Sequence, residues 1–137
     1  MVAQQHSFAG SVGRGCLLVA DHEEEVRRGF DSLFRSEGYE TFLAADDTEA
    51  VEIIRREWID VVVLELELPR TGGLGVLRVI RQVSRAGLPC VLTAVEVSGR
   101  VQVDALAEDA LTVIPKPVDA SLLKRVVASV LRRSHFY

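Results

Sequence analysis

The sequence predicts a single doubly wound α/β domain built on a five-stranded parallel sheet. Its 137 residues fit the usual size of one domain with one core. Hydrophobic residues make up 48% and charged residues 26%, which is typical of a globular chain. From residue 16 onward, short apolar runs alternate with longer stretches of helical period, as in consecutive βα units of a parallel sheet.

Five apolar runs are short enough to be strands. The first and third are nearly all apolar, so we expect them in the middle of the sheet, where helices cover both faces. Right-handed crossovers leave few topologies for five units, and the flavodoxin-like strand order 2-1-3-4-5 is the commonest at this size. The runs are CLLVA at 16–20, YETFLA at 39–44, DVVVLEL at 60–66, PCVLTA at 89–94 and LTVIP at 111–115.

Helical stretches separate the strands. We expect the first helix over 23–37, because its apolar residues recur at helical spacing and Gly38 follows as a C-terminal stop. The second helix should follow the capping region at Asp46 and Asp47. The inner faces of the second and third helices are marked by Ala50, Val51, Ile54 and Trp58, and by Leu74, Leu77 and Ile80.

The last part of the chain predicts two more helices. The fourth is expected over 98–108 with a weaker pattern, and the fifth begins after Asp119, a good N-cap, and ends near Arg133. We therefore expect a domain over 16–133, between a flexible N-terminal tail at 1–15 and a C-terminal tail at 134–137. The inner face of the fifth helix comprises Leu122, Leu123, Val126, Val127, Val130 and Leu131.

Composition excludes several classes of function. A net charge of -4 gives no general attraction for nucleic acid. Apolar runs are too short to span a bilayer, and the N-terminal segment has no export signal, so neither membrane insertion nor secretion is expected. Cys16 and Cys90 lie in apolar strand contexts, which predicts buried, reduced thiols and a cytoplasmic location.

Polar residues gather where the predicted strands end, the edge at which doubly wound sheets bind their ligands. The turn after the first strand is acidic and would repel a phosphate, while the nearby glycines precede that strand, so a flavin- or nucleotide-binding enzyme is a distant alternative. Asp21 alone could be a helix cap, and the acidic run after it a solvated first turn. The strand-end residues are Asp21, His22, Glu65, Glu67, Thr93, Ala94, Lys116 and Pro117.

Five of these signals, in order and spacing, resemble the receiver domain of response regulators. They are LLVAD, an acidic stretch that opens a helix, VVVLELELP followed by GG, VLTA, and PKP. The resemblance runs from Cys16 to about Leu131. In that family an acidic pair holds Mg²⁺, an aspartate ending the third strand receives a phosphoryl group from a histidine kinase, and a lysine and a hydroxyl contact the phosphate. The resemblance thus implies two-component, phosphorelay signalling.

Three positions depart from the family pattern. Asp21 keeps the first acidic position, but His22 stands at the second, Glu65 at the phosphoacceptor and Val113 at the aromatic switch. Because Mg²⁺ prefers hard oxygen ligands, we expect Mg²⁺ to bind weakly if at all, and no cofactor. The family residues that remain are Thr93, Ala94, Lys116 and Pro117, and the resemblance implies a cis Lys116-Pro117 bond.

The predicted pocket comprises Asp21, His22, Glu65, Glu67 and Lys116. It has three interpretations. The simplest is a structural ion pair, with Lys116 bonded to Glu65. In the second, Glu65 mimics aspartyl phosphate and holds Thr93 and Lys116 in an activated-like arrangement. In the third, His22 joins the weak metal candidates Asp21 and Glu65 in binding Zn²⁺ or another transition ion.

The leading functional hypothesis is a degenerate receiver that is not an enzyme and acts by binding proteins. By resemblance, a histidine kinase or an effector domain would bind the face formed by about 97–133, which could also form a homodimer. The alternative is a phosphorylatable, Mg²⁺-dependent switch with an unusual acceptor. It requires metal binding and a phosphate on Glu65, which the first hypothesis excludes.

Overall fold

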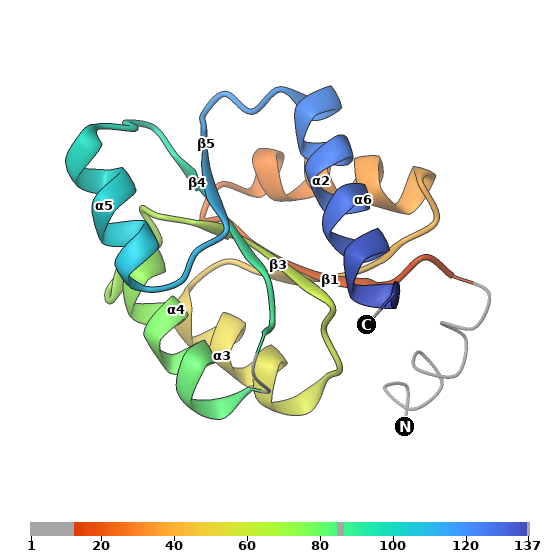
Figure 1. Ribbon diagram of the computed structural model, residues 1–137, viewed down its shortest axis with the longest axis horizontal. Coiled ribbons are helices and arrows are strands. Elements are labelled where there is room, and N and C mark those ends of the chain that lie inside the picture. The colour runs from red at the N-terminus through yellow and green to blue at the C-terminus, as the bar shows by residue number, and fades with distance from the viewer. Residues whose placement is uncertain (1–12, 85–86, 137) are drawn as a thin grey trace.

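The computed structural model describes residues 13–84 and 87–136, which form a parallel sheet between two layers of helices (Figure 1). The strands pair in the order β2-β1-β3-β4-β5, and every pairing is parallel. The predicted doubly wound topology and strand order are therefore confirmed. The strands are β1 (Cys16–Ala20), β2 (Glu40–Ala44), β3 (Val61–Glu65), β4 (Cys90–Ala94) and β5 (Thr112–Pro115).

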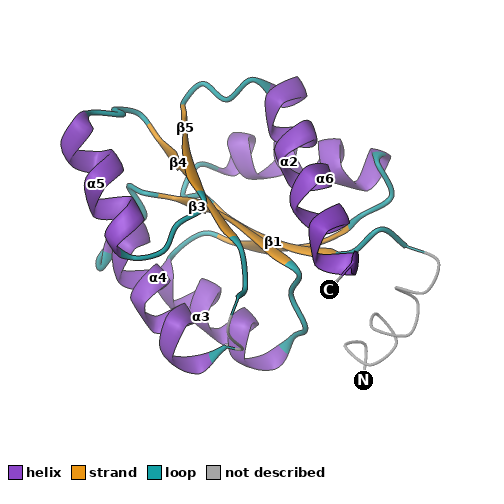
Figure 2. Ribbon diagram, in the orientation of Figure 1, coloured by secondary structure: helices purple, strands orange, loops and turns teal. Residues whose placement is uncertain are grey.

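Five helices in the described residues cover the sheet (Figure 2). Two of them, α2 and α6, pack on one face, and α3, α4 and α5 pack on the other. Figure 1 shows α5 at the outer edge of its layer, beside β5. The helices are α2 (Glu24–Ser36), α3 (Asp47–Arg56), α4 (Gly72–Val83), α5 (Gly99–Ala107) and α6 (Ala120–Phe136).

The central strands β1 and β3 are apolar, apart from Glu65 at the end of β3, because both of their faces are buried. In β3, Val62 and Leu64 join the core beneath α3, α4 and α5, while Val61 and Val63 join the core beneath α2 and α6. Successive side chains of a strand point to opposite faces, so a strand between two helix layers needs an unbroken apolar run. This explains why β1 and β3 were correctly placed inside the sheet.

Local signals set several of the helix ends. The Asp46 carboxylate accepts a hydrogen bond from the Glu49 amide at 2.9 Å, and the Asp119 carboxylate accepts one from the Ser121 amide at 2.9 Å. Gly38 has a φ of 92°, the left-handed conformation that ends the α2 region at no steric penalty. The predicted caps and stop are confirmed.

Two predictions about helix ends were wrong. Trp58 lies beyond α3 and is 57% exposed, because the chain becomes extended at Glu57 and Ile59 enters the core in its place. Helix α6 does not end near Arg133 but continues to Phe136, since no glycine or proline interrupts it. Of the predicted tails, residues 1–12 and Tyr137 lie outside the described residues.

Both cysteines are buried, and neither forms a disulfide, as predicted. Burial is the main reason that the pKa of each thiol rises to about 11. The thiols are therefore protonated and unreactive at neutral pH. Among the described helices, none has both the length and the apolar character required to cross a bilayer.

The start of α4 packs directly against the end of β3. A Cβ atom on Gly73 would overlap the Glu65 carbonyl oxygen, whereas one on Gly29, in the exposed part of α2, would meet nothing within 4 Å. We expect Gly73→Ala to lower the free energy of unfolding by about 1–3 kcal/mol. The matched Gly29→Ala should raise it by about 0.5–1 kcal/mol. Urea unfolding measures both, and equal effects of the two changes would contradict the contact.

Candidate functional site

The candidate site lies where β1, β3 and β5 end. Asp21 directly follows β1, Glu65 is the last residue of β3, and Lys116 directly follows β5. Strand alternation gives Asp21 the same side of the sheet as Val19, and Glu65 the same side as Val63. The two carboxylates therefore emerge side by side on the face covered by α2 and α6.

Lys116 joins the carboxylates. Its Nζ donates to Glu65 Oε2 at 2.6 Å and to Asp21 Oδ2 at 2.9 Å, and it lies 3.6 Å from Glu23 Oε1. The Lys116 side chain is 9% exposed, while the side chains of Asp21 and Glu65 are at most 1% exposed. The predicted ion pair between Lys116 and Glu65 is present, and Asp21 completes a buried triad with them.

His22 bonds the other oxygen, Oε1, of the Glu65 carboxylate. Its backbone amide donates to Glu65 Oε1 at 2.9 Å, and its Nδ1 lies 2.7 Å from the same oxygen. Because an ionised carboxylate only accepts, Nδ1 must carry the proton in this contact. Both oxygens of Glu65 are thus engaged, one by Lys116 and one by His22.

Hydrogen bonds outweigh burial in setting the charges of the site. Burial by itself would raise the pKa of Glu65, but the bonds from Lys116 and His22 hold that pKa below its usual value. The bond to Glu65 raises the pKa of the His22 imidazole. Burial would lower the pKa of Lys116, but its bonds to Glu65 and Asp21 raise it overall. Glu65 and Lys116 are therefore both ionised at neutral pH.

Asp21 also fixes the turn between β1 and α2. Its Oδ1 accepts from the Glu23 amide at 2.8 Å, and its backbone oxygen accepts from Arg27 Nη1 at 2.7 Å. The pocket interpretation of Asp21 is therefore correct, whereas the helix-cap interpretation is wrong, because Glu23 is the N-cap of α2 and Asp21 lies two residues before it. Sequence reasoning missed Glu23 and Arg27 as site residues, although their spacing of four is the helical signal for two side chains on one face.

Thr93, Ala94 and Lys116 are brought together by strand pairing. Thr93 is 1% exposed and pairs in register with Glu65, so it lies beside that residue on the neighbouring strand. Ala94 is buried, and its carbonyl oxygen accepts from the Lys116 amide at 2.8 Å, which fixes the position of the lysine backbone. The Lys116-Pro117 bond is cis, as the resemblance implied.

Two predicted residues lie elsewhere. Glu67 was expected in the acidic pocket, but its side chain is exposed and its Oε2 accepts from the Val95 amide at 3.2 Å. The chain has left β3 by that point, so strand alternation no longer fixes the direction of the side chain. Val113 is half-buried against the core beneath α3, α4 and α5, on the opposite face of the sheet from Glu65.

The loop after Glu65 is tied to α3 by contacts that sequence reasoning missed. Arg70, whose φ is 72°, bonds through Nη2 to the Asp47 carboxylate and to Thr48 Oγ1, and Thr71 Oγ1 donates to Asp47 Oδ2 at 3.0 Å. Asp47 is buried and was predicted only as part of a cap. No local signal pairs residues so distant in sequence, and only the folded sheet brings them together.

The residues present do not fit Mg²⁺. Asp21, His22 and Glu65 each offer one ligand atom, all within 4.8 Å of one another. Mg²⁺ requires hard oxygen ligands in near-octahedral geometry, and His22 offers a nitrogen instead. The donor set suits Zn²⁺ better, but the Lys116 ammonium already bonds both carboxylates.

Comparison with known proteins places this geometry in a family. Residues 17–128 match the response regulator receiver domain. The probable transcriptional regulator ycf27 of Porphyridium aerugineum is 34% identical over 117 residues, which cover 85% of this chain and 48% of that protein. Sporulation initiation phosphotransferase F of Bacillus subtilis is 27% identical over 115 residues, which cover 84% of this chain and 92% of that protein.

Solved structures agree with the sequence match. The receiver domain of the Francisella response regulator 1452 has a TM-score of 0.82 at 22% identity, over 88% of this chain and 98% of that one. The chain spans about half the length of the first curated relatives that it matches. With its strand order and its strand-end lysine and carboxylates in place, the chain belongs to the response regulator receiver domains of two-component signalling.

Proposed function

We propose that this chain is a receiver domain that acts by binding signalling proteins and does not accept a phosphoryl group. The observation that carries this proposal is the buried Glu65 carboxylate, whose two oxygens bond Lys116 at 2.6 Å and His22 at 2.7 Å. A carboxylate held on both oxygens is poorly placed to attack phosphorus in line, because attack would require breaking at least one of these bonds.

The metal step of phosphoryl transfer is also poorly supported. Divalent cations normally neutralise the charge that develops on the transferred group. Here the Lys116 ammonium lies between the two carboxylates that would have to bind such an ion, and His22 replaces an oxygen ligand. An incoming metal ion would have to displace a charge-assisted hydrogen bond from each carboxylate.

The partner of this domain is expected to be a protein. Receiver domains of this family interact with histidine kinases and effector domains, and we propose such a partner on the face formed by 97–133. Val103, Leu106 and Leu111 on that face are 64%, 66% and 45% exposed, and clustered exposed apolar residues are typical of interaction surfaces. We propose a cytoplasmic location, because two buried unbonded thiols suit a reducing compartment.

A phosphorylation assay separates this function from the Mg²⁺-dependent switch. Incubated with acetyl phosphate and Mg²⁺, the wild-type protein should show no added phosphoryl group by intact-mass spectrometry. The His22→Asp/Glu65→Asp double variant restores an oxygen ligand and the shorter acceptor, so it should become modified under the same conditions. Stoichiometric phosphate on wild-type Glu65 would refute the proposal.

Metal binding is best followed by calorimetry. Trp58 is a poor fluorescent reporter, because it precedes β3 and its indole nitrogen bonds Asp60, at the opposite end of that strand from Glu65. Wild-type protein should release no binding heat at millimolar Mg²⁺, while the double variant should bind. These binding heats test whether any gain of phosphorylation in the double variant accompanies a gain of Mg²⁺ binding.

Removing Lys116 should destabilise the fold strongly. Lys116→Met leaves two buried carboxylates without their shared cation, which should lower the free energy of unfolding by about 3–5 kcal/mol. The control is Lys124→Met, whose exposed pair with Glu37 at 3.4 Å should be worth about 0–1 kcal/mol. Adding Glu65→Gln to Lys116→Met should recover part of the lost free energy of unfolding, as measured by urea unfolding. Similar losses for the two lysines would show that the triad is not structural.

The bond between His22 and Glu65 should depend on pH. Because the folded-state pKa of His22 is raised above 6.5, protonation favours the fold, and this stability is fully present below about pH 6.5 and lost as pH rises through the folded pKa. An NMR titration of the His22 ring should therefore give a pKa above 6.5. In the Glu65→Gln variant the pKa of His22 should fall back toward 6.5. A wild-type pKa at or below 6.5 would contradict the bond.

A further inference from the structure

The edge of the domain formed by α5 and β5 combines exposed apolar side chains with a pocket. Val103 and Leu106 project from α5 and are 64% and 66% exposed, and Leu111, just before β5, is 45% exposed. Of the α5 residues, only Ala105 is buried. Most of the apolar surface of this helix thus faces away from the core, at the outer edge of the helix layer (Figure 1).

The pocket lies between α5 and β5 and has a volume of about 220 Å³. Ala105, Leu106, Leu111 and Val113 are among its lining residues. Sites for cofactors and drug-sized ligands usually measure about 300–1,000 Å³, so this pocket is closer to the size of one large side chain. The short branched side chain of Val113 leaves this volume open.

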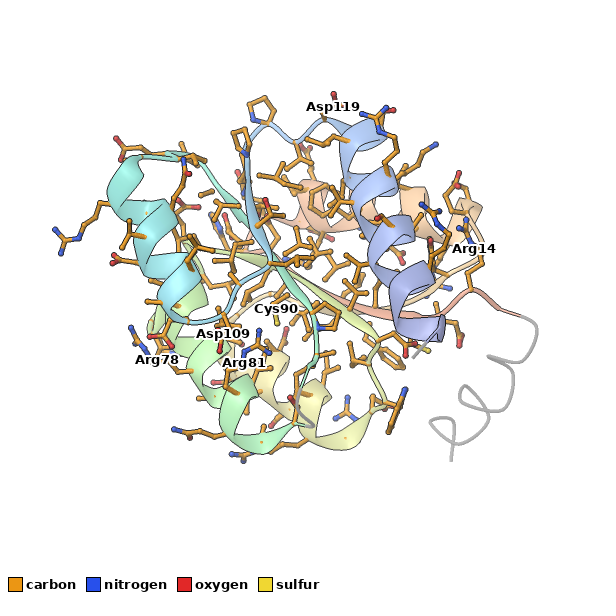
Figure 3. All side chains as sticks on the ribbon, in the orientation of Figure 1. Arg14, Arg78, Arg81, Cys90, Asp109 and Asp119 are labelled. Carbon is orange, nitrogen blue, oxygen red and sulfur yellow. The ribbon has the colours of Figure 1, made fainter. Side chains whose placement is uncertain are left out.

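A larger depression adjoins the pocket. It has a volume of about 640 Å³ and shares Leu106, Ala110 and Leu111 with the first pocket. Figure 3 shows Arg81 and Asp109, which also line the depression, close together at the end of α5. A segment of chain could lie along this depression with one side chain inserted into the smaller pocket.

Charge identifies the kind of segment. Residues 95–111 contain four carboxylates, on Glu96, Asp104, Glu108 and Asp109, and one guanidinium, on Arg100, for a net charge of -3. Arg78 of α4 bonds Glu108 at 2.8 Å and Arg81 of α4 lines the depression beside Asp109, so these two guanidinium groups offset two of the negative charges. The edge remains acidic, so it attracts basic partners. A second copy docking with the same edge would meet like charges.

We propose that this pocket receives one large apolar side chain from a partner protein, presented by a segment that carries Lys or Arg beside it. A buried apolar anchor in a pocket with complementary charge around it is the usual form of a protein-binding hot spot. The inference rests on the proposed binding function and adds the chemistry of the partner segment.

The test is a selection from a phage-displayed library of random peptides on the wild-type protein. Enriched peptides should share an aromatic or large aliphatic residue flanked by Lys or Arg. For a synthetic copy of the best peptide, measured by fluorescence anisotropy, Val113→Phe should fill the pocket and weaken binding about tenfold or more. Val113→Thr preserves shape without filling the pocket, so its affinity should stay close to the wild-type value.

Two further variants keep the test decisive. If Val113→Phe does not fold, Leu106→Ser removes an exposed wall of the pocket and should weaken the same peptide. Asp104→Lys should weaken the peptide and reduce the salt dependence of binding. Enriched peptides without basic residues, no enrichment at all, or affinities that ignore Val113→Phe and Leu106→Ser would overturn the proposal. Dimerisation through this edge, measured by light scattering and lost in Leu106→Ser, would also overturn it.

This outcome is independent of the phosphorylation assay. A protein that accepts phosphate but binds the basic peptides would refute the proposed function and keep the pocket. A protein that stays unmodified, but whose peptide affinity does not change in Val113→Phe, would support the proposed function and overturn the pocket.

Discussion

The Lys116 ammonium between Asp21 and Glu65 is the interaction on which the site depends. The three residues come from the ends of β5, β1 and β3, so one cation holds three strand ends together. The side chains of Asp21 and Glu65 are at most 1% exposed. Both carboxylates could not remain ionised without Lys116, since an unpaired buried charge is strongly destabilising. Thr93 and His22 adjoin this arrangement, because Thr93 pairs with Glu65 on the neighbouring strand and the amide of His22 bonds the Glu65 carboxylate.

The extra methylene of Glu65 changes what this arrangement can do. A longer side chain carries its carboxylate farther from the strand, to where the backbone amide and ring of His22 bond one oxygen while Lys116 bonds the other. The positive groups that surround the carboxylate are therefore supplied by the chain itself. In the proposed function, Lys116 and His22 supply the positive charge that a bound cation would otherwise bring to Glu65.

The sequence predicted the strands, their order and the ion pair because each rests on a strong signal. Buried parallel strands require continuous apolar runs, and the ends of such strands meet at one edge, which brought Lys116 to Glu65. The predictions for Trp58 and Glu67 failed because both residues lie just beyond a regular element, where periodicity no longer sets side-chain direction. The contacts of Asp47 with Arg70 and Thr71 link residues more than 20 positions apart, and no pattern in a single sequence indicates such a pair.

Glu65 and Val113, two departures from the family pattern, lie on opposite faces of the sheet. Glu65 lies on the side of α2 and α6, and Val113 packs on the side of α3, α4 and α5. A change at the carboxylate would have to cross the sheet to reach the α5 edge, and a small branched side chain has no ring to rotate between two positions. The proposed function, with one set of contacts at the site and no aromatic switch at β5, therefore implies a single resting form of the α5 edge. A partner that recognises this form would bind it continuously, and its own abundance, instead of phosphorylation, would set how much complex is present.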